Sequence, residues 1–471
     1  MDTTKELETK PVGQLLWQYA LPSVASQVIT SIYNIVDRVF LGHSGDGNGA
    51  LYLAALAITF PLMNIIHAFG SLVGAGSSAR MSIVLGRKDV RWAEKILGNS
   101  MLLTFFFGFL FVTAGYVWMK PILTLFGASP QTLGFACRYM DIVLPGMFLV
   151  TLTLNLTGLI RASGYPMKAM WIMIGSAILN ILLDYVFISI MGKGIEGAAW
   201  GTTISMALAS IVAILHFVMP SSFIRFRAHA WAPKLYIFRN ILAIGISPFS
   251  MNVAGFAVVA VLNHQLTYYG QDNAVAVYGV VNSAAGLIMM MLLGVCQGMQ
   301  PIAGYNYGAR RNDRLRQVYV LTMQVCVALG TIGMLLSLIF PRLIISCFNT
   351  DAAILSMGVP ALRYLMVFAP LIAFTITNSQ LFQSIDQPWI AIVTSLSRQV
   401  LFLIPISLIL PGIYFRLKGD GVTGVWVSCM ICDFLGAALS AILLVTHRQV
   451  FRLDYVPPQR RPRHEAGPKN D

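Results

Sequence analysis

Long apolar segments recur from one end of this 471-residue chain to the other. A helix needs about 20 predominantly apolar residues to cross the hydrocarbon core of a bilayer. Segments of that length with few charges indicate transmembrane helices and not the core of a soluble domain. The sequence therefore predicts twelve membrane spans, near residues 15–41, 50–72, 97–119, 133–160, 167–190, 197–219, 239–268, 274–300, 317–340, 360–383, 389–411 and 421–446.

The composition agrees with a protein that lies mostly inside a membrane. Hydrophobic residues make up 57% of the chain and charged residues only 11%, whereas soluble domains carry roughly 25% charged residues. The net charge of +13 would suit a nucleic-acid-binding protein, but the basic residues lie in short loops between apolar segments. We therefore expect membrane lipids and no nucleic acid among the partners.

The distribution of lysine and arginine predicts the orientation of the chain. If the N-terminus is cytoplasmic, the cytoplasmic segments hold 22 of the 32 basic side chains and the external segments hold seven. Cytoplasmic loops of membrane proteins carry an excess of basic residues, so we expect both termini in the cytoplasm. The other three basic residues, Arg38, Arg80 and Arg398, lie near or inside predicted spans.

The sequence also contains an internal repeat. Landmarks of the first half recur in the same order after a shift of 222–227 residues, which indicates a duplicated unit. Because each unit holds six spans, the halves share one orientation and should be related by a pseudo-two-fold axis along the membrane normal, with a central cavity between them. The pairs are Pro22 with Pro248, Gly76 with Gly298, Gly86 with Gly308, Tyr139 with Tyr364, Pro145 with Pro370, Pro166 with Pro388, and 194–200 with 421–427.

The expected fold is an all-α integral membrane protein divided into five regions. Proline removes a backbone donor and can bend a helix. Since Pro22 recurs as Pro248, it is the candidate hinge for alternating access. The regions are a cytoplasmic N-terminal tail (1–14), a six-helix half (15–220), a cytoplasmic linker (221–238), a second six-helix half (239–447) and a basic cytoplasmic tail (448–471).

Three acidic residues lie deep in predicted spans, where a carboxylate is costly and by default indicates function. They are Asp37, Asp184 and Asp433. Asn180 precedes Asp184 by four residues and Tyr33 precedes Asp37 by four, so each pair shares one helix face. Neighbouring spans add the polar side chains of Tyr139, Asn155 and Thr202.

The oxygen atoms of these side chains suit Na⁺ or a hydrogen-bond network that stores a proton. The sequence has no histidine and cysteine cluster for a transition metal, so we expect no cofactor, only H⁺ or Na⁺ as a coupling ion. Removal from water favours the neutral form of a carboxyl and so favours proton binding. The alternative is structural: Asp37 would pair with its neighbour Arg38, and Asp184 would be satisfied by Asn180.

The acids do not repeat between the halves. The shift places Asn263 opposite Asp37 and Ile406 opposite Asp184. The second half therefore keeps the scaffold and lacks both acids, so coupling should reside in the first half.

Three segments carry a resemblance to a known family: QLLWQYALPSVASQVITSIYNIVDRVFLGHSG, RASGYP and NILLDYVFI. With the two six-helix halves, they resemble the multidrug and toxic compound extrusion (MATE) family over roughly residues 12–447. Within it, the chain is similar to the DinF-type branch and its MepA-like multidrug exporters. It departs from the NorM-type branch, which has acids in spans 7 and 10 of the second half; here both spans lack one.

The resemblance implies a secondary active multidrug exporter of the bacterial plasma (inner) membrane. In such an antiporter H⁺ or Na⁺ moves inward while organic, often cationic, compounds leave by alternating access, which connects the family with xenobiotic transport and antibiotic resistance. We expect a monomer. By position the resemblance implies coupling carboxylates at Asp37 and Asp184, a cation site completed by Asn180 and Thr202, where Na⁺ would bind, and hydrogen-bonding neighbours at Tyr33, Tyr139 and Asn155.

Two other functions remain as alternatives. A lipid-linked oligosaccharide flippase of the same superfamily would need a cavity rich in arginine and lysine, for which only Arg38, Arg80 and Arg398 are candidates within spans. A membrane-embedded enzyme would need a catalytic motif such as HExxH or GxSxG, and neither occurs. The residues suit H⁺ and Na⁺ equally, and the substrate is not specified.

Overall fold

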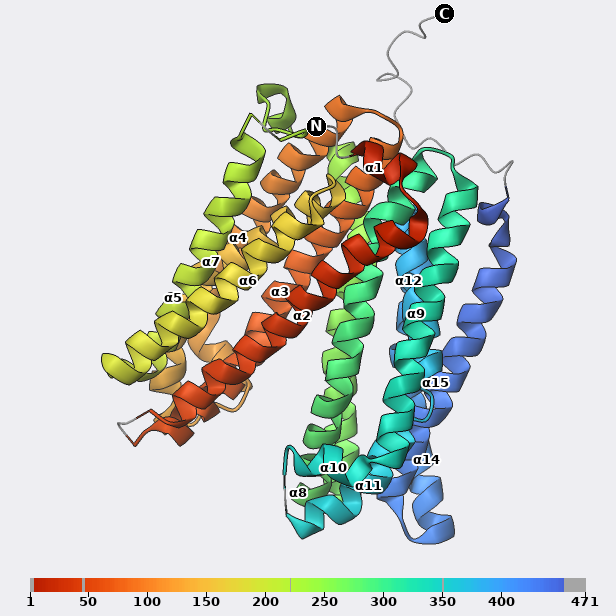
Figure 1. Ribbon diagram of the computed structural model, residues 1–471. Coiled ribbons are helices and arrows are strands. Elements are labelled where there is room, and N and C mark those ends of the chain that lie inside the picture. The colour runs from red at the N-terminus through yellow and green to blue at the C-terminus, as the bar shows by residue number, and fades with distance from the viewer. Residues whose placement is uncertain (1–3, 45–46, 221, 350, 453–471) are drawn as a thin grey trace, which may run out of the picture.

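The computed structural model describes residues 4–44, 47–220, 222–349 and 351–452 (Figure 1). Helices joined by short connections make up this part of the chain. Most of the basic tail predicted at 448–471 lies outside the described residues, as do the first three residues of the N-terminal tail.

The first half consists of α2 to α7, preceded by the short α1. Local sequence determines several of the helix starts. The Asp89 side chain caps α4. At the start of α5, Ser129 and Thr132 form a reciprocal capping box around Pro130, the first residue of the helix. The elements are α1 (Thr4–Thr9), α2 (Val12–Gly42), α3 (Gly49–Gly86), α4 (Val90–Leu125), α5 (Pro130–Ala162), α6 (Pro166–Asp184), the π-helix η1 (Tyr185–Ile190) and α7 (Gly194–Val218).

The second half begins after the 3₁₀ turn η2 (Ala228–Trp231). Its first element, α8, is two spans joined at a break where Gln271 leaves helical geometry with φ 56°. The elements are α8 (Leu235–Gly308), α9 (Asn312–Ile339), α10 (Pro341–Ser346), α11 (Ala352–Met366), α12 (Ala369–Ser384), α13 (Pro388–Leu396), the π-helix η3 (Ser397–Leu403), α14 (Ile404–Lys418), α15 (Gly421–Thr446) and η4 (Arg448–Phe451).

Twelve transmembrane segments, six in each half, contain all the long helices of the described chain. Ten are individually long and apolar enough to cross a membrane, and the pair α11 and α12, bent by 46°, makes one more. The twelfth is α2, whose 31 residues suffice for a crossing although polar side chains interrupt its apolar sequence. The predicted twelve-helix, all-α architecture in two halves is confirmed, and α2 starts at Val12, three residues before the predicted boundary.

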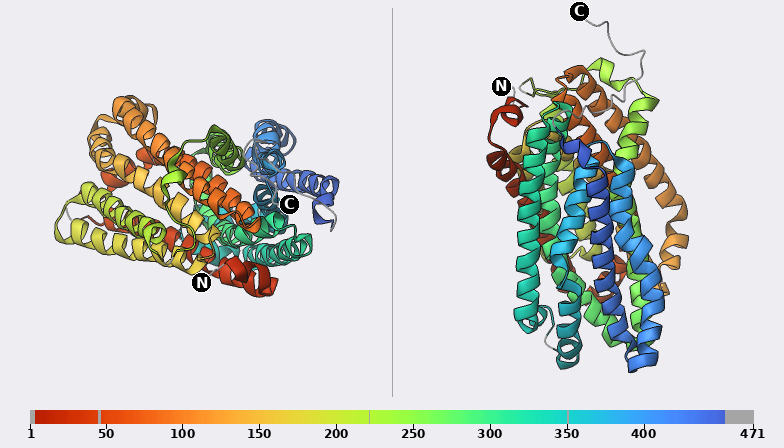
Figure 2. Two further views of the ribbon diagram at one scale, coloured as in Figure 1. Left: turned by 90° about the horizontal axis from the view of Figure 1, so that it is seen from above. Right: turned by 90° about the vertical axis from the view of Figure 1, so that its right-hand side faces the viewer.

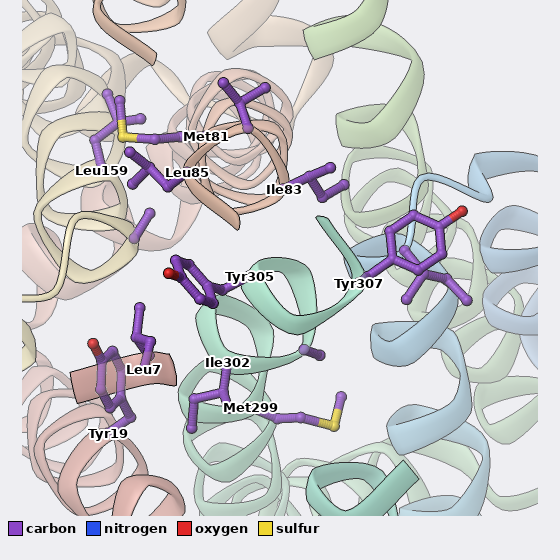
Figure 3. Close-up of a cluster of buried hydrophobic side chains, with 14 of the residues drawn as sticks. Leu7, Tyr19, Met81, Ile83, Leu85, Leu159, Met299, Ile302, Tyr305 and Tyr307 are labelled. Atoms are coloured by element: carbon purple, nitrogen blue, oxygen red, sulfur yellow. The ribbon is translucent and has the colours of Figure 1, made fainter. Parts of the chain in front are cut away.

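The two halves pack against each other at one end and diverge towards the other (Figure 1). One buried apolar cluster is shared between them and includes Met81, Ile83 and Leu85 of α3 with Ile302 and Tyr305 of α8 (Figure 3). At the other end each half has a cluster of its own. Viewed from above, the first half lies on one side and most of the second on the other (Figure 2).

Glycine makes the shared contact possible. A Cβ added to Gly86 of α3 would lie 2.0 Å from the carbonyl oxygen of Tyr305, and one added to Gly308 of α8 would lie 2.0 Å from that of Ile83. Gly86 and Gly308 are repeat partners, and so are Ile83 and Tyr305 at the same shift of 222 residues. The contact is thus reciprocal, as expected where two equivalent helices cross near a pseudo-two-fold axis.

A buried ion pair also joins the halves at this end. Arg80 of α3 donates from Nη1 to Oδ2 of Asp386, at 2.8 Å, and the two side chains are only 2% and 5% exposed. Asp386 follows α12 in the left-handed conformation, with φ 60°, where the repeat has Gly164, with φ 99°. A non-glycine residue there is strained by about 1–3 kcal/mol. The ion pair with Arg80 offers a physical reason why aspartate occupies this position.

The glycine contact yields a direct test. Gly308→Ala would push a methyl group into the backbone of α3, so we expect it to destabilise the protein by about 1–3 kcal/mol. The measurement is the thermal unfolding midpoint of the purified protein in detergent.

Gly279→Ala on the same helix is the matched control, because no atom lies within 4 Å of its added Cβ. We expect the control to unfold at the wild-type temperature or slightly above it. Equal midpoints for the two variants would contradict the packing role of Gly308.

Candidate functional site

The two acids predicted from the sequence lie on neighbouring helices of the first half. Asp37 is near the end of α2, and Asp184 is the last residue of α6, which packs along α2. Their exposed fractions are 8% and 0%. Directly after Asp184 the helix widens into the π-helix η1, a distortion that is frequent at functional sites.

The carboxyl oxygens of this pair have few protein partners. Neither Oδ1 nor Oδ2 of Asp184 has a hydrogen bond to a described residue, and the same is true of Oδ1 of Asp37. The two acids interact electrostatically with each other and with Tyr33 and Tyr139. Tyr139, on α5, is 2% exposed. The structure thus brings both acids and both tyrosines into one cluster, in which Tyr33 is half-buried and the other three side chains are buried.

Asn180 and Thr202 complete the cluster on the side of α6 and α7. Nδ2 of Asn180 donates to Oγ1 of Thr202 at 3.4 Å, which leaves the buried Oδ1 of Asn180 without a hydrogen bond among the described residues. The free oxygens of Asn180, Asp184 and Asp37 are all acceptors. A proton or a cation with a preference for oxygen ligands would satisfy them.

Gly201 of α7 leaves room for the Asp184 carboxyl. A Cβ at this position would lie 2.3 Å from Oδ1 of Asp184. Nothing in the local sequence connects Gly201 with an acid 17 positions earlier. In the fold it determines how closely the carboxyl approaches α7.

Asn155 belongs to a different network from the acids. Its Oδ1 accepts from Oγ of Ser77 at 2.7 Å, and its Nδ2 donates to Ser100 and Thr104 at 3.2 and 3.0 Å. These bonds connect α3, α4 and α5. None of the hydrogen bonds of Asn155 with described residues leads to the acid cluster. Asn155 instead joins three helices.

Neither structural alternative for the acids matches the contacts. Arg38 is exposed, and its guanidinium lies 5.6 Å from the centre of the Phe60 ring. Its charge acts on the Asp37 carboxyl, but the two side chains form no ion pair among the described residues. Asn180 donates to Thr202 and not to Asp184. Pro22, the candidate hinge, lies inside α2, which continues through it as one helix.

The third acid has a partner that the sequence did not reveal. Nε of Arg398, in η3, donates to Oδ1 of Asp433, in α15. Asp433 is 3% exposed. Arg80 likewise pairs with Asp386. Two of the three span arginines are therefore neutralised by an acid, so they add no net positive charge of the kind a flippase of pyrophosphate-linked lipids would need.

Comparison with known proteins places the chain in a family. The model of the MatE family matches residues 22–186 and again 243–409, one segment in each half. The protein belongs to the MatE family, whose members are multi-pass transporters of the plasma membrane and not enzymes.

Curated relatives and solved structures agree. The chain is 26% identical to Multidrug export protein MepA of Staphylococcus saprophyticus over 438 residues, 93% of this chain and 94% of that one. It is 26% identical to the MepA of Staphylococcus aureus strain MRSA252 over the same shares. Among solved structures, a MOP superfamily transporter from Pyrococcus furiosus and an outward-facing multidrug resistance MATE family transporter each superimpose with a TM-score of 0.87 at 22% identity, over 96% of this chain and 98% of that one. These structures support the fold alone.

The position of Gly201 yields a second test. Gly201→Ala would place a methyl group against Oδ1 of Asp184 and displace the carboxyl, so we expect transport to fall by about tenfold or more. The measurement is the initial rate of transport of a fluorescent organic cation in proteoliposomes.

Gly175→Ala on α6 is the control, because its added Cβ meets no atom within 4 Å. It should transport at the wild-type rate. Wild-type transport by the Gly201→Ala protein would show that the position of the Asp184 carboxyl is unimportant.

Proposed function

We propose that this protein is a secondary active multidrug exporter, an antiporter that couples inward movement of H⁺ or Na⁺ to the efflux of organic, often cationic, compounds. The observation that carries the proposal is the pair of buried acids, Asp37 and Asp184, with unpaired oxygens in a membrane-embedded helix bundle. Uncompensated charge in a membrane interior is rare and marks proton relays and ion pathways. The similarity to MepA exporters supports the same function.

The distribution of charge supports an orientation for the bundle. The loops at the joined end follow α3 and α8 and carry Arg87 and Lys88 in one case and Arg310 and Arg311 in the other. Cytoplasmic loops are enriched in such residues. We therefore assign the joined end to the cytoplasm, together with both termini, and the diverging end to the exterior, which corresponds to an outward-facing state.

The acid cluster would couple ion binding to movement of α2. When Asp37 and Asp184 are ionised, they attract a cation and repel each other; a proton or Na⁺ removes that repulsion. Because Asp37 lies on α2 and Asp184 on α6, removing the repulsion between the two carboxylates changes the interaction energy between these helices. Pro22, which cannot donate a backbone hydrogen bond, is where we expect α2 to bend in response.

The halves, residues 15–220 and 239–447, would then rock against each other as units, so that the joined end parts while the diverging end closes. A ligand shifts a conformational equilibrium only by its different affinity for the two states. Inward-moving H⁺ or Na⁺ and outward-moving compound therefore need to favour opposite states. We expect one copy of the chain to be sufficient, because each acid and its neighbours come from a single first half.

The coupling role can be tested with Asp37→Asn and Asp184→Asn. Removal of either carboxylate should lower ion-driven efflux of a fluorescent organic cation by about tenfold or more. Proteoliposomes with separately imposed H⁺ and Na⁺ gradients give the measurement, and the gradient that drives the wild type identifies the coupling ion.

Asp141→Asn, which removes an exposed carboxylate from α5 of the same half, is the matched control and should transport like the wild type. If both variants of the cluster kept the wild-type rate under the driving gradient, coupling would have to reside elsewhere.

A further inference from the structure

A small cavity with both polar and apolar lining residues lies inside the second half, separate from the acid cluster. Its volume is about 80 Å³, and α8, α12, α13 and η3 enclose it. Because a water molecule occupies about 30 Å³ in the liquid, this space can hold a small polar group but not a drug-sized molecule. Its polar lining includes Thr375, Ser379, Gln380, Gln383, Arg398 and Gln399.

Two glutamines of this lining have unsatisfied amide atoms. Nε2 of Gln383, a donor, and Oε1 of Gln399, an acceptor, are buried without a hydrogen bond to any described residue. Gln383 is 4% exposed. The hydroxyls beside them are already bonded to backbone carbonyls: Thr375 to Leu371 and Ser379 to Ala391. An unpaired buried polar group is unfavourable, and a ligand with matching polar atoms would remove that cost.

Arg398 is one of the lining residues, and an acid holds its guanidinium in position. Asp433 accepts from Nε of Arg398 and is not part of the cavity wall. The Arg398 side chain is 24% exposed, whereas that of Asp433 is 3% exposed. No described residue accepts from the two Nη atoms of Arg398. A guanidinium that is bound through one nitrogen keeps N–H donors in a planar fork, which matches the two oxygens of a carboxylate.

The repeat shows that this arrangement is specific to the second half. Shifts of 222 and 227 residues place Ser176 opposite Arg398 and Met206 opposite Asp433. In the first half the equivalent helices, α6 and α7, meet through a contact of 3.8 Å between Oγ of Ser176 and the Met206 sulfur. The two halves therefore carry polar groups of opposite kind. The first half has unpaired acids, and the second half has the Arg398 guanidinium, which is bound to an acid, and the unpaired amide donor of Gln383.

We propose that this cavity binds the carboxylate of zwitterionic organic substrates, with Nη atoms of Arg398 and Nε2 of Gln383 as donors. The ammonium or other cationic group of such a compound compensates the charge that the carboxylate adds beside the neutral pair of Arg398 and Asp433. The rest of the compound stays outside the 80 Å³ space. The inference rests on the proposed export function but not on its coupling residues.

The test compares two dyes that differ only at the carboxylate, rhodamine B and its ethyl ester. Their dissociation constants are measured by fluorescence polarisation with the purified, full-length protein in detergent. We expect the wild type to bind the free acid about tenfold more tightly than the ester, in the range expected for hydrogen bonds to a charged group. Equal affinities would overturn the proposal, since the cavity would then hold only water.

Two variants locate the selectivity. Arg398→Gln combined with Asp433→Asn removes both charges together, so no unpaired charge is left buried; we expect the preference for the acid to disappear while ester binding is unchanged.

Gln383→Met removes a donor that has no protein partner, so it should keep the thermal midpoint and reduce the preference severalfold. Arg363→Gln, at an exposed position of α11, is the charge-matched control and should retain the full preference.

Equal loss of both dyes in a folded double variant would assign these residues to packing and overturn the proposal. If the double variant does not fold, Gln383→Met decides the question alone. Export of the ester from proteoliposomes separates the two hypotheses: its absence would refute the export function, whereas the binding ratio tests the carboxylate site independently.

Discussion

The close crossing of α3 and α8 is the contact on which the rest of the arrangement depends. Gly86 and Gly308 allow each helix to touch the backbone of the other, and the buried pair of Arg80 and Asp386 lies at the same end. Breaking a buried ion pair by removing one partner costs about 3–5 kcal/mol. The halves are therefore joined firmly at one end, while each has its own apolar cluster at the other. For alternating access this contact has to part while the diverging end closes.

The membrane interior explains why the polar residues are informative. A charge there must be paired, neutralised or used. Arg80 and Asp433 are paired with partners from distant segments, and Asn155 joins three helices through its amide. Against that background the unpaired oxygens of Asp37 and Asp184 stand out as groups that need a proton or a cation from outside the protein.

Much of the fold and part of the site could be predicted from the sequence. Apolar segments of transmembrane length and a repeat at nearly constant shift led to twelve helices in two halves, because the bilayer permits few alternatives. Helical spacing predicted that Asn180 and Asp184 share one helix face, and the following span supplied Thr202. That Asp37, four spans earlier, belongs to the same site was implied only by the family resemblance. The pairs of Arg80 with Asp386 and Arg398 with Asp433 were not, because 306 and 35 residues separate their members and no local pattern relates them. Nor could spacing place Asn155 with Ser77, Ser100 and Thr104, since that contact depends on how three helices pack.

We propose that the two buried acids control how far the halves open. Spin labels at the diverging ends of α2 and α14, read by double electron–electron resonance, measure that opening in lipid nanodiscs. The account predicts that lowering the pH or adding Na⁺ shifts the distance distribution in the wild type, and that Asp37→Asn combined with Asp184→Asn abolishes the shift. A shift that persists unchanged in the double variant would contradict it.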